Sequence, residues 1–464
     1  MAEQLHMAST YPEAEIQLHS RGSRPSPIPA PSIHPAPDDV LLSPPRRQQA
    51  LLLLAGFMMI FHIIGINTSF GIFQARPDFY TSDGSNIPSA RKNDALVSLV
   101  GTIGSGLTWS GGIFVNPIMA RFENVKLITF IGTAVMSLGL LLASYSSTLW
   151  QLFLTQGLLY GLGSSFYYFP IMSIAPAYFD RHRGFAMGCI LSGAGVGGLV
   201  MAPVLQVLLD RYGVHTALRI LAAWNFAIGL PVAAVVRRRG AFNRSADAAR
   251  TRVNMALVKR RTFVYQALGA LFQAAGNVIP LYYMTSYAVS VLSYSRSTGS
   301  LLLAVNSGVN SVARIAMGIL ADSVGRQNTL ICGALLSSLA VFALWYDAAR
   351  ERFIAFVVVY GIYAGGYNAL IPTTITEIYG VENYARVNGS IYFVRGLGSL
   401  LGAPIAGLIL GSHTRGGTAP GADLRARFDR VVVYDGALLL CASLCVAYVR
   451  WLDARDKGVW RWKA

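Results

Sequence analysis

The chain is built from long apolar stretches that recur with short polar breaks between them. Each stretch holds about 20 residues, which is the length a helix needs to cross a hydrocarbon layer of roughly 30 Å. They predict transmembrane helices over twelve segments: 50–73, 95–119, 127–145, 150–171, 184–209, 215–236, 262–288, 297–320, 329–346, 353–371, 387–410 and 431–452. A chain with this pattern folds as an all-α membrane protein.

The charge composition supports the same conclusion. Only 13% of the 464 residues are charged and 53% are apolar, whereas a soluble domain carries roughly 25% charged residues. The net charge of +16 would suggest a nucleic-acid partner if the basic residues formed one patch. Instead, with the N-terminus inside, 24 of the 38 basic residues fall in cytoplasmic segments. This asymmetry predicts cytoplasmic N- and C-termini, a lipid bilayer as surroundings and no nucleic-acid partner.

The order of the segments predicts two six-helix halves. The expected parts are a disordered cytoplasmic tail over 1–49, an N-terminal bundle over 50–236, a basic cytoplasmic linker over 237–261, a C-terminal bundle over 262–452 and a short tail over 453–464. The string GVGGLVMAP at 195–203 returns as GLGSLLGAP at 396–404, an offset of 201 residues. Two related halves are typical of transporters that alternate around a central site.

Three short motifs connect this pattern to a known family. The segment 318–326, GILADSVGR, resembles the G-x-L-a-D-r-x-G-R element between helices of the major facilitator superfamily. The segment 178–188, YFDRHRGFAMG, and the segment 69–73, SFGIF, resemble the monocarboxylate transporter family, and the proline-rich tail resembles its fungal branch. The likeness covers nearly all of 50–452 and implies the major facilitator fold. It also implies that Asp322 and Arg326 form a conformational latch on the cytoplasmic side.

The basic residues within the predicted helices are candidates for solute binding, because a buried charge is expensive unless it is used or paired. In the resembled family an arginine at the place of Arg314 binds the substrate carboxylate. Arg314 could instead reach back to the cytoplasmic interface. Arg395 could contact solute or pair with an acidic side chain such as Glu377.

Two departures from the family pattern argue against its familiar lactate-and-proton mechanism, although proton coupling of another kind stays open. The family's aspartate four residues before the arginine is Asn310 here, and a lysine of its proton-coupled members is replaced by Thr68. His62 in the first helix could relay protons, although a single histidine is more often a packing residue. No metal ligand set or other cofactor site is predicted.

Polar residues at cavity depth complete the predicted site. The resemblance implies that the first, fourth, seventh and tenth helices line the cavity, as they do in the superfamily. The substrate-binding candidates are Arg314, Asn310, Asn67, Thr68, Tyr167, Asn277, Tyr367 and Arg395.

These features predict a secondary transporter that moves a small organic solute, carboxylate-bearing or aromatic, by alternating access. The alternatives are an efflux carrier for a neutral fungal specialised metabolite and a non-transporting membrane sensor. The expected location is the plasma membrane, with a monomer as the functional unit. An enzyme is not expected, since no nucleophile–base set or paired carboxylates appear within the helices.

Overall fold

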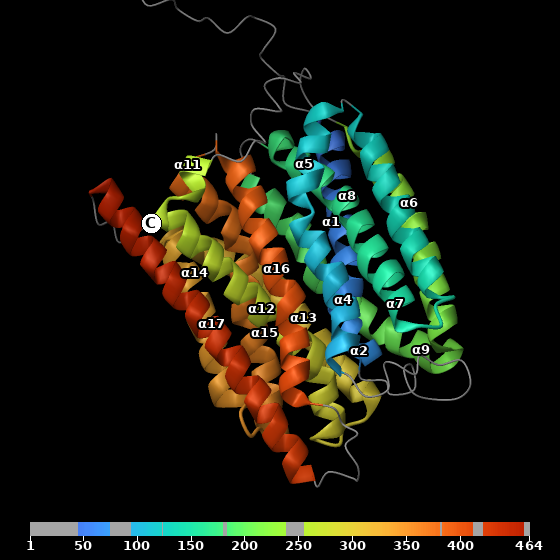
Figure 1. The fold of residues 1–464 in the computed structure, drawn as a ribbon. Coiled ribbons are helices and arrows are strands. Elements are labelled where there is room, and N and C mark those ends of the chain that lie inside the picture. The colour runs from blue at the N-terminus through green and yellow to red at the C-terminus, as the bar shows by residue number, and fades with distance from the viewer. Residues whose placement is uncertain are drawn as a thin grey trace, which may run out of the picture. The chain divides into compact units, whose positions relative to one another are not determined.

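A computed structural model describes residues 45–74, 94–122, 124–179, 183–237, 255–380, 383–411 and 421–458. Most of the predicted N-terminal tail and of the predicted linker lies outside these residues, as do the last residues of the C-terminal tail. The bounds predicted for these parts therefore remain predictions. The described residues form helices throughout (Figure 1).

The first half of the chain supplies the helices that Figure 1 colours from blue to green. They are α1 (Arg46–Thr68), α2 (Phe70–Gln74), α4 (Asp94–Ser110), α5 (Gly112–Arg121), α6 (Val125–Ala143), α7 (Leu149–Leu152), the π-helix η3 (Phe153–Leu159), α8 (Tyr160–Tyr178) and α9 (Arg183–Val235). The second half supplies α11 (Met255–Val258), α12 (Arg261–Ser290), α13 (Arg296–Val324), α14 (Arg326–Ala340), the π-helix η4 (Val341–Trp345), α15 (Arg350–Tyr379), α16 (Tyr384–Leu410) and α17 (Gly421–Lys457).

All twelve predicted segments are helical. Among the described residues, eight helices are long and apolar enough to cross a membrane, or nine when the bent pair 95–110 and 112–121 counts as one span. One of the eight, α9, contains two predicted segments and breaks between them at Gly213, whose φ of 72° and ψ of 177° are not helical. The segments 150–171 and 262–288 are helical as well, in α7 to α8 and in α12.

The outer surface of the helices is apolar, as a lipid-facing surface must be. Large side chains such as Leu138, Leu154, Val312, Ile319 and Leu408 are exposed on different helices. In a water-soluble protein such a surface would cause aggregation. Here it provides the contact with lipid tails.

The repeated glycine strings take corresponding places in the two halves. A methyl group on Gly195 of α9 would lie 2.5 Å from the carbonyl oxygen of Ser307 in α13, and one on Gly396 of α16 would lie 2.5 Å from that of Gly106 in α4. Each of these glycines thus lets one half approach the other closely. The internal repeat predicted from sequence is therefore visible in the packing.

The neighbouring glycines serve packing within each half. Gly193 and Gly197 lie against the backbone of α1, where a methyl group on Gly197 would collide with the carbonyl oxygen of Phe61. Gly398 lies in the same way against Leu271 of α12. Among these glycines of α9, Gly195 therefore contacts the other half, whereas Gly193 and Gly197 contact α1 of the same half.

The latch motif lies at the junction of α13 and α14. Gly325 has a φ of 109°, a conformation that favours glycine, and it joins the two helices directly. Arg326 begins α14. Asp322 is in the last turn of α13, but its side chain is outside the described part of the structure, so the latch remains a prediction.

Candidate solute-binding site

A cavity of about 100 Å³ lies between the two halves. It is lined by residues of α1, α4, α8, α9, α12, α13, α15 and α16, so both halves contribute four helices. These include the first, fourth, seventh and tenth predicted segments, which the family resemblance implied. A site shared between halves can change its exposure when the halves move.

Six of the eight predicted site residues line this cavity. They are Asn67 and Thr68 of α1, Asn277 of α12, Asn310 and Arg314 of α13, and Arg395 of α16. Helical spacing explains the grouping, since residues on one face of each helix reach the same space. Tyr167 and Tyr367 lie outside the lining.

Tyr167 belongs to an aromatic pair inside the first half. Its side chain is fully buried, and its ring centroid is 5.3 Å from that of His62. His62 is also fully buried, and its Nδ1 lies 2.6 Å from the carbonyl oxygen of Met58. The next residue along α8, Tyr168, lines the cavity in place of Tyr167. His62 thus packs inside the first half, with its Nε2 unpaired in the described structure, and a proton relay through it stays a prediction.

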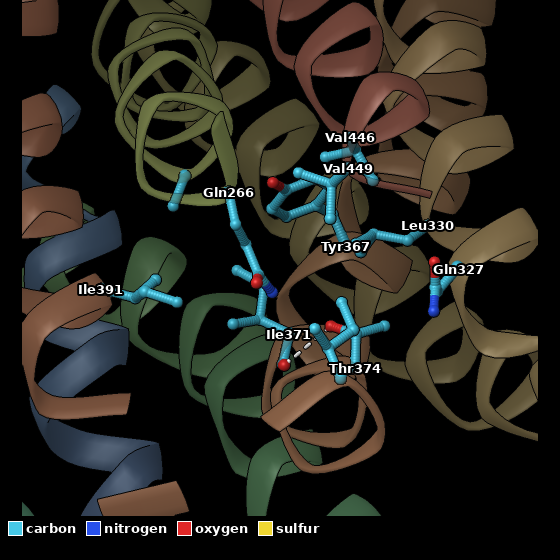
Figure 2. Close-up of a pocket in the computed structure, with 11 residues that line it drawn as sticks. Gln266, Gln327, Leu330, Tyr367, Ile371, Thr374, Ile391, Val446 and Val449 are labelled. Carbon is cyan, nitrogen blue, oxygen red and sulfur yellow. Dashed lines mark hydrogen bonds between the residues drawn. The ribbon is translucent and has the colours of Figure 1, made fainter. Parts of the chain in front are cut away.

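Tyr367 packs within the second half. It lines a small cavity of about 10 Å³ with Gln266 of α12 and Val446 and Val449 of α17. Figure 2 shows its ring beside the two valines, with Ile371 one turn and Thr374 two turns further along α15. The cavity residue contributed by this part of α15 is the adjacent Asn368.

Arg314 connects the two halves at the cavity. Its Nε donates a hydrogen bond to Oδ1 of Asn310 at 2.9 Å, so the amide takes the place of the family's aspartate. One of its terminal amino groups donates to the carbonyl oxygen of Leu191 in α9 at 3.0 Å. The side chain thus faces the cavity and does not reach back to the cytoplasmic interface, which was the alternative.

Arg395 lies in an aromatic setting at the same cavity. Its guanidinium carbon is 5.2 Å from the ring centroid of Trp109 and 5.5 Å from that of Tyr392, distances typical of cation–π contacts. It also donates a hydrogen bond to Oδ1 of Asn368. The suggested pairing with Glu377 is not found among the described residues, where the carboxylate of Glu377 accepts a hydrogen bond from Gln327 at 3.1 Å.

The lining is electropositive and holds unused donors. Both arginines line the cavity and interact as like charges, and no aspartate or glutamate is among the lining residues. Nε of Arg395 and Nδ2 of Asn67 are buried and have no hydrogen-bond partner in the described structure. Buried donors without partners cost free energy, so this arrangement favours a ligand that brings negative charge and acceptor oxygens.

Sequence reasoning missed some of the residues that shape this cavity. Trp109 and Tyr282 are aromatic residues inside apolar runs, so nothing in their spacing separated them from lipid-facing or core positions. Ser105 and Ser399 are small hydroxyl residues of the kind that helix packing commonly uses. Only the assembled helices show which face each of these residues presents.

Comparison with known sequences finds one matching family model and several fungal transporters that are similar to this chain. A family model described as Major Facilitator Superfamily matches residues 49–403 and 267–459. The "MFS-type transporter pynF" of Aspergillus niger is 27% identical over 77% of this chain and 80% of its own length. The "Agnestins efflux protein AgnL12" of Paecilomyces divaricatus is 28% identical over the same shares of the two chains.

The resemblance to monocarboxylate transporters also appears in this comparison. "Monocarboxylate transporter 11" of Mus musculus is 29% identical over 61% of this chain and 65% of its own length. Among solved structures, a bacterial homologue of the human lysosomal transporter Spinster superposes with a TM-score of 0.64, over 90% of this chain and 99% of that one, at 15% identity. The structural likeness supports the shared fold.

Proposed function

Because the chain belongs to the Major Facilitator Superfamily, we propose that it carries a small organic anion with an aromatic part out of the cell by alternating access. That it is a membrane transporter follows from the family and from its transporter relatives. The class of solute and the direction of transport are the proposal. The observation that supports the solute class is the pair of cavity arginines, since the described residues that line the cavity include no aspartate or glutamate.

The aromatic setting of Arg395 supports an aromatic anion over a small aliphatic one. Trp109 contacts the rings of both Tyr168 and Tyr392, with centroid distances of 5.4 and 5.9 Å. These rings give a flat solute apolar surface to pack on, while the guanidinium groups meet its carboxylate. Asn67, Asn277 and Asn368 supply further polar contacts.

Arg314 gives a physical link between solute binding and movement. In the cavity described here its guanidinium bonds to the carbonyl oxygen of Leu191 across the two halves. A carboxylate is a stronger acceptor than a neutral carbonyl. Solute that binds Arg314 would therefore replace this contact and weaken one connection between α13 and α9.

Export is the direction supported by the fungal relative whose printed name is an efflux protein. We place the protein in the plasma membrane with both termini in the cytoplasm, as the basic-residue asymmetry favours, and we take the monomer as the functional unit. Transport requires no chemical change in the solute, so we assign no catalytic residues.

Untargeted metabolite profiling of cells and medium, with and without the protein, tests this function. We expect one acidic aromatic compound to accumulate in the medium only when the protein is present. Arg314→Gln should reduce this export roughly tenfold or more, since a charged hydrogen bond contributes about 1.5–3 kcal/mol. Arg219→Gln is the matched control, because Arg219 is also inside a helix but contacts Tyr145 and Ser144, away from the cavity.

Other outcomes would change the proposal in defined ways. Accumulation inside the cells would reverse the direction and keep the site. Export of a neutral compound that does not depend on Arg314 would support the carrier for a neutral specialised metabolite. A membrane sensor would predict no change in any compound.

A further inference from the structure

The centre of α17 carries a carboxyl group for which the proposed function has no use so far. Asp435 is fully buried, and neither of its carboxylate oxygens has a hydrogen-bond partner in the described structure. An ionised carboxylate in such a place would be very unfavourable. A carboxyl group kept inside the membrane without a partner points to a function that uses its proton.

The space around Asp435 is formed by neighbouring helices of the second half. A methyl group on Gly276 of α12 would lie 3.1 Å from Oδ1 of Asp435, so the glycine leaves room for the carboxyl. On α14, the hydroxyl of Ser338 donates to the carbonyl oxygen of Gly436 at 2.8 Å, which fixes α17 at the residue after Asp435. The position of the carboxyl is therefore held by packing.

Few ionisable groups face this carboxyl. Tyr360 on α15 and Tyr434 on its own helix interact electrostatically with it. The membrane part of α12, from Thr262 to Ser290, and the segment from Gln327 to Trp345 contain no charged residue. Within the described residues, no basic side chain donates a hydrogen bond to either carboxylate oxygen.

Tyr360 is near both Asp435 and the solute cavity. It lines the cavity and interacts electrostatically with Asp435, and its hydroxyl is buried without a hydrogen-bond partner in the described structure. Gly276, which packs against Asp435, is followed along α12 by Asn277, which also lines the cavity. A change in the cavity can thus reach Asp435 through α12 and α15.

We propose that Asp435 is a proton-binding site, that it holds a proton in the conformation described here, and that it couples proton movement to solute transport through Tyr360. The proton binds a carboxylate oxygen and is released to water when movement of the halves opens a route past Tyr360. This step requires no other reactant. The coupling rests on the transport function proposed above, whereas proton binding by Asp435 does not.

The first test detects the proton directly. Infrared difference spectra of the purified full-length protein in lipid vesicles, recorded while the pH changes over roughly two units on either side of neutrality, should contain the carbonyl band of a protonated carboxyl. This band should be lost in Asp435→Asn and kept in Asp429→Asn. Asp429 is the matched control, since it lies on the same helix and accepts a hydrogen bond from the backbone of the exposed Asp347. An unchanged band in Asp435→Asn would overturn the proposal.

The second test separates coupling from transport. Vesicles with the wild-type protein should accumulate the exported compound when a pH gradient is imposed, and they should also exchange labelled for unlabelled compound. Asp435→Asn should lose the gradient-driven accumulation and retain the exchange. Equal gradient-driven accumulation in both proteins would overturn the coupling.

Two further outcomes are distinguishable from these. Failure of the proposed function would show as absence of both activities in the wild-type protein, and the infrared band would still decide whether Asp435 binds a proton. Misfolding of the variant would show as loss of its sharp thermal unfolding transition. The Asp435→Glu variant then replaces it, and a carbonyl band shifted in frequency relative to wild type supports the site, whereas an unshifted band overturns it.

Discussion

The two arginines of the cavity differ in what their guanidinium groups contact. Arg314 is held by an amide oxygen and a backbone carbonyl, whereas Arg395 lies over two aromatic rings and keeps one buried donor unpaired. A lysine carries the same charge but lacks the planar group that stacks on rings and donates in a fixed fork. Replacing the planar guanidinium by an ammonium group should therefore weaken solute binding more at Arg395 than at Arg314.

We expect Arg395→Lys to weaken the apparent affinity for the anionic solute by roughly five- to thirtyfold, which corresponds to about 1–2 kcal/mol of lost stacking and hydrogen bonding. Arg395→Gln should cost more, because the charge is also lost. Concentration-dependent transport in vesicles measures both. Equal affinities for wild type and Arg395→Lys would mean that the residue acts only through its charge.

At the residue scale, the sequence predicted the kinds of side chain in the cavity better than the individual residues that line it. Arg314 and Arg395 could be found because charges are rare inside apolar helices. Tyr167 and Tyr168 could not be separated, since adjacent residues differ by only one helical step and the buried face was unknown. Asp435 was overlooked although the same rule of rare intramembrane charges applies to it, so its signal was present in the sequence.

At the element scale, the glycine repeat shows which helix pairs cross between the halves. Gly195 packs α9 on α13, and Gly396 packs α16 on α4, at places related by the internal repeat. Both contacts bring backbone against backbone, so no side chain can move aside to accept a methyl group. The sequence showed that these glycines correspond, but only the assembled helices show that Gly195 and not Gly197 faces the other half.

Gly195→Ala and Gly396→Ala should each destabilise the conformation described here by about 1–3 kcal/mol, the usual cost of overpacking. We expect a lower transport rate in vesicles and a lower unfolding temperature of the purified protein. Gly188→Ala is the control, because a methyl group there would meet no described atom within 4 Å. Its helix should gain up to about 1 kcal/mol. Normal transport by both interface variants would show that the halves tolerate a wider spacing.

At the scale of the whole molecule, the predicted latch would hold the cytoplasmic side of the cavity closed. Gly325 and Arg326 fix the junction of α13 and α14, and the family resemblance gives Asp322 the role of holding that side shut. We expect Asp322→Asn to make a cysteine placed at Ser192 react faster with a thiol reagent applied from the cytoplasmic face, and to slow transport. Unchanged accessibility together with unchanged transport would remove the latch from the mechanism.

The opposite side of the molecule is sealed by contacts between the halves near the end of α1. The ring of Phe70 in α2 lies 5.3 Å from the ring of Tyr282 in α12, and a methyl group on Gly71 would lie 2.5 Å from the carbonyl oxygen of Leu281. The hydroxyls of Ser105 and Tyr282 are 3.4 Å apart across the same boundary. In the orientation proposed above, with the N-terminus in the cytoplasm, these contacts would close the cavity toward the outside.

Gly71→Leu should prevent this closure, because the added side chain meets backbone that cannot yield. The readout is the reaction of a cysteine at Asn277, in a protein whose four native cysteines are replaced, with an impermeant maleimide added outside the cell. We expect labelling roughly tenfold faster in Gly71→Leu. If the substitution destabilises the outward-closed state by about 1.4 kcal/mol, the ratio of outward-open to outward-closed protein rises tenfold. Gly188→Leu should leave the rate unchanged. If Gly71→Leu is labelled slowly from outside and fast from the cytoplasm, another contact forms the outer seal. If the parent protein is already labelled fast from outside, the assigned orientation is reversed.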